Sequence, residues 1–164
     1  MTNTQKEDGT TQAWERAYRW LCRRRQHAPP NADVWDLRFK WPLKQFQWLN
    51  RVLAGEYRLS PMQVYRRRNK SWVQWSAHDA LVLKWVAIQI EEQLPRNTSC
   101  HHLKGHGGVV GSTQCVSSAW RCGEWRYVYR TDIRGYYRHI LKCQVAGQLH
   151  WHIEDAVCRN LCLQ

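Results

Sequence analysis

Asp132 is the residue whose surroundings best suit catalytic chemistry. Before it, aromatic residues alternate with Arg and Val over residues 125–130, and these residue types favour a strand. After it, Gly135 allows the backbone to turn, and residues 136–141 have the character of a helix start. A carboxylate at the exit of a strand can hold a divalent cation beside a bound substrate. The same carboxylate can equally serve as the cap of the next helix, and spacing alone does not separate the two readings.

The segment Tyr129-Arg-Thr-Asp132-Ile-Arg-Gly135-Tyr-Tyr137-Arg-His-Ile140 resembles the first catalytic block of reverse transcriptases, especially those of bacterial retrons and group II introns. In that family a strand carries an Asp, followed by an aliphatic residue, usually a basic residue and Gly, and then two aromatic residues. The resemblance implies that the carboxylate of Asp132 and the backbone carbonyl of Ile133 bind Mg²⁺, with Mn²⁺ as an alternative ion. It also implies that Tyr137 occupies the sugar-gate position, where a bulky ring rejects a ribose 2′-hydroxyl.

A predicted β-hairpin with a following helix precedes this block. Residues 57–65 have an extended pattern, residues 68–71 form a turn, and residues 72–75 return as a strand. Ser76-Ala-His-Asp79 is a capping box before an apolar helix at 80–90. This unit is similar to the fingers region of the same enzymes, and residues 102–108 look like their loop between fingers and palm. The resemblance as a whole covers roughly residues 40–150.

Basic residues gather on the predicted hairpin. Residues 58–70 hold five Lys or Arg and no acid, which suits contact with a phosphate backbone or a nucleotide triphosphate, although exposed arginines on a hairpin are also ordinary surface. Under the resemblance, Arg66, Arg67 and Lys70 contact the triphosphate or the template. The further candidates for nucleic-acid contact are Arg58, Arg68, Arg134 and Arg138.

The composition favours a polyanionic partner. The formal net charge is +12, with 25 Lys plus Arg against 13 Asp plus Glu, so nucleic acid is the first candidate and a membrane surface the second. Eleven Trp and seven Tyr can stack on bases, although we expect most of these rings to be core. No secretory signal or membrane-spanning run is evident, which predicts a cytoplasmic protein with seven reduced cysteines.

We therefore expect an α+β fold: N-terminal helices, a fingers-type β-hairpin with its helix, and the first strand and helix of a right-hand polymerase palm, truncated after that point. The expected helices span 12–25 and 43–54, with a linker at 28–31 and Pro42 in the first turn of the second helix. The expected segments are a disordered tail at 1–10, a helical part at 11–55, a fingers-like part at 56–110 and a partial palm at 111–164.

The family's second acidic element, an aromatic-x-Asp-Asp turn, is absent from the sequence. One carboxylate holds Mg²⁺ weakly, so we expect that this chain alone does not polymerise, whatever RNA template and DNA primer it binds. An unpartnered palm strand predicts an exposed edge, with poor solubility or a molten palm end, and is inconsistent with uniformly strong hydrogen-exchange protection across 125–164.

Two other classes of function remain open at this point. The first is a non-enzymatic RNA- or DNA-binding protein, which needs only the basic charge and the aromatic residues. The second is a zinc module, whose ligands would be Cys100, His102 or His106, Cys115 and Cys122. The spacing of these ligands is outside the usual short zinc patterns, so the zinc module is the weaker of the two.

Overall fold

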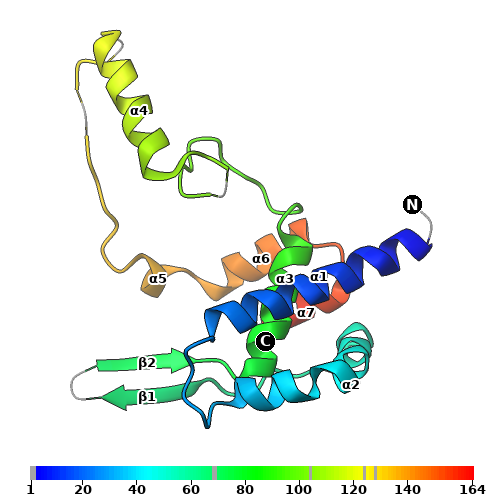
Figure 1. The fold of residues 1–164 in the computed structure, drawn as a ribbon. Helices are drawn as coiled ribbons and strands as arrows, with labels where there is room; N and C mark the ends of the chain where they lie inside the picture. The colour runs from blue at the N-terminus through cyan, green and yellow to red at the C-terminus, as the bar shows by residue number, and fades with distance from the viewer. Residues whose placement is uncertain (1–2, 68–69, 104, 124, 128) are drawn as a thin grey trace. The chain divides into compact units, whose positions relative to one another are not determined.

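The computed structural model describes residues 3–67, 70–103, 105–123, 125–127 and 129–164, and it has a mixed α+β fold (Figure 1). The chain divides into two units by its internal contacts. The core unit consists of residues 1–94 and 146–164, and the middle unit consists of residues 95–145. The expected α+β class is therefore confirmed at this coarse level, with one small antiparallel sheet among the described residues.

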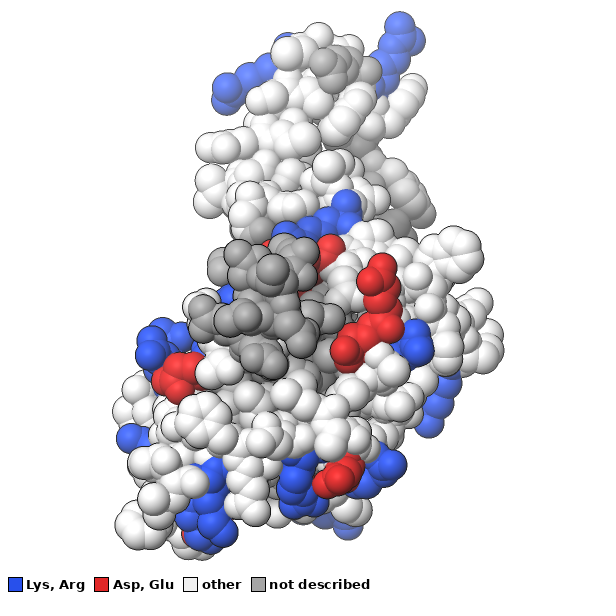
Figure 2. Space-filling model, turned by 90° about the vertical axis from the view of Figure 1, so that its right-hand side faces the viewer, with Lys and Arg blue, Asp and Glu red and all other residues white. Residues whose placement is uncertain are grey.

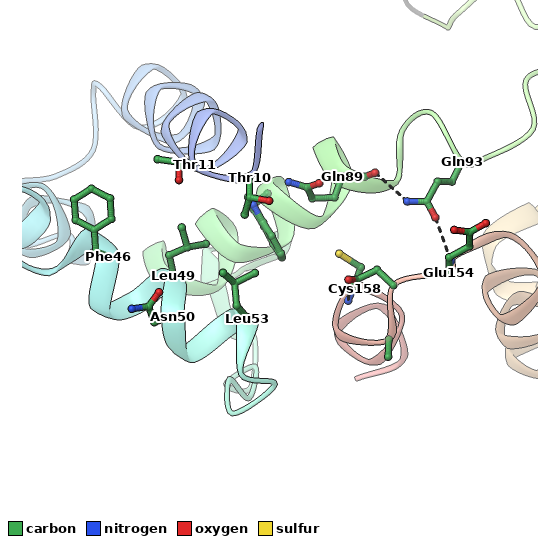
Figure 3. Close-up of a pocket in the computed structure, with 13 residues that line it drawn as sticks. Thr10, Thr11, Phe46, Leu49, Asn50, Leu53, Gln89, Gln93, Glu154 and Cys158 are labelled. Atoms are coloured by element: carbon green, nitrogen blue, oxygen red, sulfur yellow. Dashed lines mark hydrogen bonds between the residues drawn. The ribbon is translucent and has the colours of Figure 1, made fainter. Parts of the chain in front are cut away.

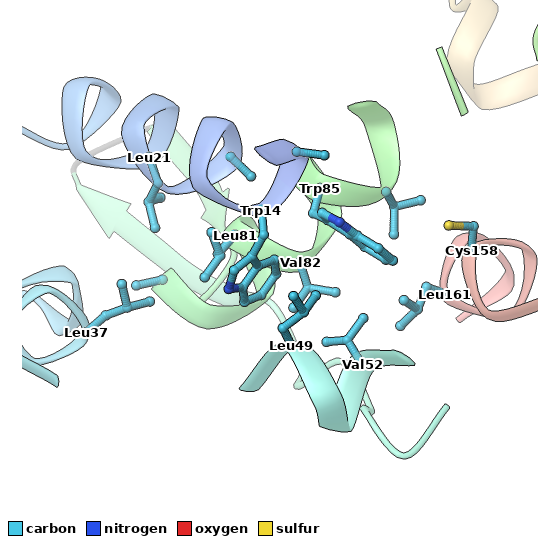
Figure 4. Packing of buried hydrophobic residues seen from close by; sticks show 14 of the residues in the cluster. Trp14, Leu21, Leu37, Leu49, Val52, Leu81, Val82, Trp85, Cys158 and Leu161 are labelled. Atoms are coloured by element: carbon cyan, nitrogen blue, oxygen red, sulfur yellow. The ribbon is translucent and has the colours of Figure 1, made fainter. Parts of the chain in front are cut away.

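Four helices build the core unit: α1 (Asn3–Arg24), α2 (Asp33–Leu53), α3 (Ala77–Ile90) and α7 (Ala156–Leu163). Helix α1 packs along α3, and α7 contacts the same helix. Trp14 lies at the centre, stacked on Trp41 at 5.9 Å between ring centroids and edge-on to Trp85 at 6.4 Å (Figure 4). Aromatic rings therefore make up much of this core, as the sequence predicts for most of its Trp residues.

Helix α1 follows the apolar spacing of its sequence. Its buried side chains recur at helical intervals, so one stripe faces the core and the arginines lie outside it: Ala13, Trp14, Ala17 and Leu21. The helix begins at Asn3, within the segment expected to be a polar tail. The predicted helix is thus confirmed and is longer than expected.

Helix α2 starts earlier than predicted, since the sequence suggested a start near Pro42. It begins at Asp33, and Pro42 lies in its interior. Asp33 and Asp36 favour the earlier start because carboxylates stabilise the first turn of a helix. Burial of Val34 and Leu37 on the same stripe as Trp41 adds packing energy, which outweighs the hydrogen bond that Pro42 cannot donate. In the C-terminal half of α2, Leu49 is buried, whereas Phe46 and Leu53 are exposed.

The β-hairpin and its following helix agree with the sequence. Strands β1 (Gln63–Arg67) and β2 (Lys70–Gln74) pair antiparallel, and Figure 1 shows them projecting from the helices of the core unit. Ser76 caps α3 by accepting a hydrogen bond of 3.0 Å from the backbone N–H of Asp79, which confirms the predicted cap. Leu81 and Trp85 are buried on the inner face of α3.

The middle unit contains helix α4 (Gly108–Arg121), the short helix α5 (Tyr136–His139) and the start of α6 (Lys142–His152). Helix α4 was not predicted from the sequence. Its Gly, Ser, Thr and Val residues have low helix propensity, which hides the helix from a pattern search. Among the described residues of this unit, Ala119 is the one hydrophobic residue that is buried.

The strand predicted over residues 125–130 is absent from the described part of that segment. Residues 125–127 and 129–130 have an irregular backbone, and the only sheet among the described residues is the β1–β2 hairpin. A strand is stabilised by hydrogen bonds to a neighbouring strand, and none pairs with these residues in the described chain. The alternating pattern predicted the wrong secondary structure because it carries no information about a partner.

The C-terminal segment belongs to the core unit, although residues 111–164 were expected to form one partial palm. Ile153, Cys158 and Leu161 are buried in the core that α1, α2 and α3 share. The side chain of Gln164 accepts a 2.8 Å hydrogen bond from the backbone N–H of Leu59. The expected palm segment is thus divided between the two units.

Candidate nucleic-acid interface

The β-hairpin presents an exposed pair of stacked rings. Tyr65 pairs with Trp72 across the two strands, and their ring centroids lie 5.9 Å apart at an interplanar angle of 12°. Both side chains are exposed, so the pair offers a flat π surface to solvent. The Tyr65 hydroxyl donates a hydrogen bond of 2.6 Å to Gln63, which holds the ring in place. Such a surface can accept a stacked base.

Two of the predicted hairpin arginines, Arg66 and Arg67, follow Tyr65 in strand β1. Arg66 is exposed and pairs in register with Ser71, and Arg67 pairs in register with Lys70. Because side chains alternate along a strand, the Arg66 position falls on the face opposite the Tyr65–Trp72 pair. The side chains of Arg67 and Lys70 lie outside what the structure describes. Arg68 lies outside the described residues.

The foot of the hairpin is fixed by Asp79, whose side chain is 1% exposed. Its carboxylate accepts hydrogen bonds from the hydroxyls of Tyr57 at 2.9 Å and Ser76 at 2.6 Å, and from the hydroxyl of Ser60. Burial alone raises the pKa of Asp79, but the hydrogen bonds from Ser60, Ser76 and Tyr57 outweigh it and leave the pKa lowered. Burial and the hydrogen bond to Asp79 also raise the pKa of Tyr57.

A cleft of about 440 Å³ opens beside this foot. Arg51, at the end of α2, and Arg58, before β1, both line it, together with His78. Arg58 donates hydrogen bonds to the carbonyls of Gly55 at 3.0 Å and Tyr57 at 3.1 Å, so its guanidinium is held at the rim. Sequence reasoning identified Arg58 and missed Arg51, because no local pattern brings the end of α2 to the hairpin.

The residues around Asp132 form the second basic and aromatic region, in the middle unit. Tyr127 and Tyr129 are 89% and 90% exposed, and Trp125 and Tyr136 are also exposed. These rings alternate with exposed arginines, and Asp132 is the one acid in residues 125–138: Arg126, Arg130, Arg134 and Arg138. We call residues 125–138 the aromatic–arginine segment.

Within this segment the predicted turn and helix form, but the helix is short. Gly135 has φ = 69°, the left-handed conformation that glycine adopts most readily, and α5 begins at the next residue. The N–H of Arg138 donates to the carbonyl of Gly135 at 2.8 Å. Tyr137 is the second residue of α5, and its side chain, which the sugar-gate prediction concerns, lies outside what the structure describes. Asp132 and Ile133 are exposed in the loop just before it.

Asp132 and Ile133 supply one carboxylate and one backbone carbonyl toward the Mg²⁺ that the resemblance implies. Mg²⁺ prefers six oxygen ligands in octahedral geometry, so these two donors do not by themselves form a protein site. In the part of the chain that the structure describes, no three His, Cys, Asp or Glu side chains come together in a way that suits a metal ion. The sulfur of Cys100 lies 3.5 Å from a ring nitrogen of His102. The described side chains of the zinc candidates make no other contact with one another.

The predicted site residues therefore fall in the two different units. Arg58, Arg66, Arg67 and Lys70 belong to the core unit, whereas the Asp132 group belongs to the middle unit: Asp132, Ile133, Arg134, Tyr137 and Arg138. On the face drawn in Figure 2, Lys and Arg side chains are spread among uncharged and acidic ones.

The chain matches no protein-family model, no curated protein and no solved structure. Its described helices include none with the length and apolar character needed to cross a lipid bilayer.

Proposed function

We propose that the chain binds single-stranded nucleic acid, with bases stacked on exposed tyrosine and tryptophan rings and phosphates contacted by arginines. The observation that carries the proposal is the aromatic–arginine segment, in which rings and guanidinium groups alternate in solvent. Buried rings would have indicated a core instead. The stacked and exposed Tyr65–Trp72 pair offers a second surface on which a base can stack.

The physical basis is the sum of two modest interactions. Stacking of one base on one aromatic ring contributes about 1–3 kcal/mol and tolerates any base. Each phosphate contact releases a counterion, so affinity falls steeply as salt is added. The net charge of +12 adds long-range attraction for a polyanion.

A fluorescently labelled 20-nucleotide RNA and its single-stranded DNA equivalent test the proposal by anisotropy. The double substitution Tyr127→Ala/Tyr129→Ala is expected to weaken binding at least tenfold at 100 mM salt, because it removes two stacking surfaces. Trp151→Ala is the matched control, since it removes an 83% exposed ring from α6, outside both basic regions. Equal losses for both variants, or affinity indifferent to salt, contradict the proposal.

A second candidate function is Mg²⁺-dependent polymerisation at Asp132. It is supported by the resemblance of residues 129–140 to reverse transcriptases, together with the glycine turn and helix that follow Asp132. In this proposal the aromatic–arginine segment and the hairpin contact the RNA template and the DNA primer. The sequence lacks the family's second acidic element, the aromatic-x-Asp-Asp turn, so we expect no primer extension by the chain alone.

Asp132→Ala separates the two candidates. A pure binding role predicts unchanged or slightly tighter RNA binding, because the substitution removes a negative charge from a basic segment. A catalytic role predicts primer extension with Mg²⁺ or Mn²⁺ by the parent chain, abolished by Asp132→Ala. Template-dependent synthesis by the parent chain would overturn our expectation that it does not polymerise.

A further inference from the structure

Both phenylalanines of the chain lie in solvent on one helix, α2. Phe39 is 81% exposed and Phe46 is 60% exposed, and Leu43 between them is 85% exposed. Residues four and seven positions apart share one face of a helix, so these side chains form a continuous apolar stripe. We call these three residues the outer stripe of α2. Contiguous apolar surface in water marks a site of interaction, whereas single exposed apolar residues are ordinary.

The outer stripe ends at an open cavity of about 900 Å³ between α1, α2, α3 and α7. Phe46 and Leu53 line this cavity, and so does Trp85. Figure 3 shows the ring of Phe46 apart from Leu49 and Leu53, the other apolar side chains of α2 that it labels. The lining also includes carboxylates and amides, so the uninterrupted apolar surface is the outer stripe itself.

Cationic side chains flank the outer stripe. Helical spacing places Arg38 on one side of it and Lys44 on the other. Both are exposed, and neither forms an ion pair within the described part of the chain. The acids of α2 lie in its first turn, and Asp36, the acid next to the stripe, is paired with Lys40 at 2.7 Å. The unpaired charge beside the stripe is therefore positive, which favours an anionic partner.

An anionic lipid surface fits these features better than a protein or a nucleic acid does. The stripe presents no hydrogen-bonding side chain, and a bilayer interface requires neither such bonds nor a matching shape. A second copy of the chain would bring the same cations to the contact, at a net charge of +12 on each copy. A nucleic acid binds by stacking on rings, and Leu43 at the centre of the stripe has none.

We propose that α2 binds the surface of an anionic lipid bilayer. The outer stripe enters the boundary between headgroups and acyl chains, while Arg38 and Lys44 extend to the lipid phosphates. The proposal goes beyond the nucleic-acid interface and uses none of its residues, so either can fail while the other stands.

Co-sedimentation of the full chain with lipid vesicles tests the proposal. Vesicles of phosphatidylcholine with about 30% phosphatidylserine are expected to bind at least tenfold more tightly than phosphatidylcholine alone, because their negative surface attracts nearby cations. Phe39→Gln/Leu43→Gln is expected to lower affinity for the anionic vesicles at least tenfold, since two apolar side chains no longer leave water. Lys44→Glu is expected to lower it at least fivefold.

Val109→Gln/Val110→Gln is the matched control. It makes the same kind of exchange at two exposed apolar positions of α4, and it is expected to leave vesicle affinity unchanged. The affinity of Phe39→Gln/Leu43→Gln for the labelled RNA is also expected to stay unchanged. Circular dichroism checks the folding of each variant. Should the double variant of α2 not fold, Leu43→Gln decides alone, because that side chain is the most exposed of the stripe.

The proposal is overturned if the chain does not bind anionic vesicles at millimolar lipid, or if the α2 variant binds them as tightly as the parent chain. An equal loss in the α4 control would overturn it as well. A dimer that dissociates in the α2 variant, seen by sedimentation velocity, would instead assign the stripe to a second copy. A parallel loss of RNA affinity would assign it to nucleic acid, and either result also overturns the proposal.

Discussion

The helical core of the core unit and the aromatic–arginine segment of the middle unit use the same residue types in opposite ways. In the helical core, Trp14 contacts both Trp41 and Trp85 out of solvent. In the middle unit, Trp125, Tyr127 and Tyr129 are exposed. An aromatic ring that leaves water stabilises a fold, whereas one that stays in water is available to a partner. The difference is set by what packs around a ring, and residue type alone does not reveal it.

Hydrogen exchange should show the largest contrast. Amides in α3 and α7 are expected to exchange at least about a thousandfold more slowly than those at residues 125–135, because helix hydrogen bonds over a buried core open only with unfolding of that core. The sequence predicts that residues 125–164 are not uniformly protected, and the structure divides this range between the middle unit and the core unit at residue 146. Mass spectrometry of deuterated peptides measures both regions at once. Strong protection over 125–135 would show that the segment has a packing partner.

Removal of one ring from each unit should give the next largest effect. Trp14→Ala is expected to lower the free energy of unfolding by about 3–5 kcal/mol, through lost burial and the cavity left behind. Tyr129→Ala is expected to change it by less than about 0.5 kcal/mol, since that ring is exposed. Urea denaturation followed by circular dichroism compares the two. Similar losses would remove the distinction between the units.

Asp79→Ala should destabilise the core unit by about 2–3 kcal/mol at pH 7, because three hydroxyl groups lose their common acceptor. The pKa of Asp79 is lowered in the folded state, so its contribution is present above the unfolded-state pKa and is lost as pH falls through the folded-state value. The gap between the parent chain and Asp79→Ala should therefore narrow as pH falls below about 4, the ordinary pKa of an Asp carboxyl. Asp132→Ala, in the exposed loop, serves as the control and is expected to change the free energy of unfolding little at pH 7 or at acidic pH.

The smallest effect concerns His78, which packs edge-on against Trp48 at 4.6 Å. Burial lowers the pKa of His78, so the unfolded chain binds a proton at a higher pH than the folded chain does. Stability is expected to fall as pH drops below about 6.5, by at most about 1.4 kcal/mol per pH unit. In His78→Phe this part of the pH dependence should disappear in urea titrations at pH 7.5 and pH 5.5. An unchanged slope would mean that His78 is not the group responsible.

Local chemistry made some elements predictable. The hairpin was found because turn residues separate two short β-prone runs, and α3 was found because Ser76 and Asp79 mark its start. Elements decided by tertiary contacts were missed. Pro42 suggested a helix start, but burial of Val34 and Leu37 extends α2 beyond it.

The candidate site was predictable to a similar degree. The basic and aromatic residues were identified from their types, and Gly135 with α5 from their order. The prediction of a strand before Asp132 was wrong, since an alternating pattern does not show whether a neighbouring strand is present to pair with it. Arg51 and the cavity beside Trp85 are produced by helices that meet only in the folded chain, so no stretch of sequence indicates them.

Asp79 also determines how the hairpin can vary. Its carboxylate accepts hydrogen bonds from Tyr57 and Ser60, which precede the hairpin, and from Ser76, which follows it. The two ends of the hairpin are therefore held at one point, and the described side chains of its strands are not part of the core. The hairpin can therefore vary independently of the helical core. Its length and its tip can be redesigned, or can diverge during evolution, with little consequence for the folding of the helices to which it is attached.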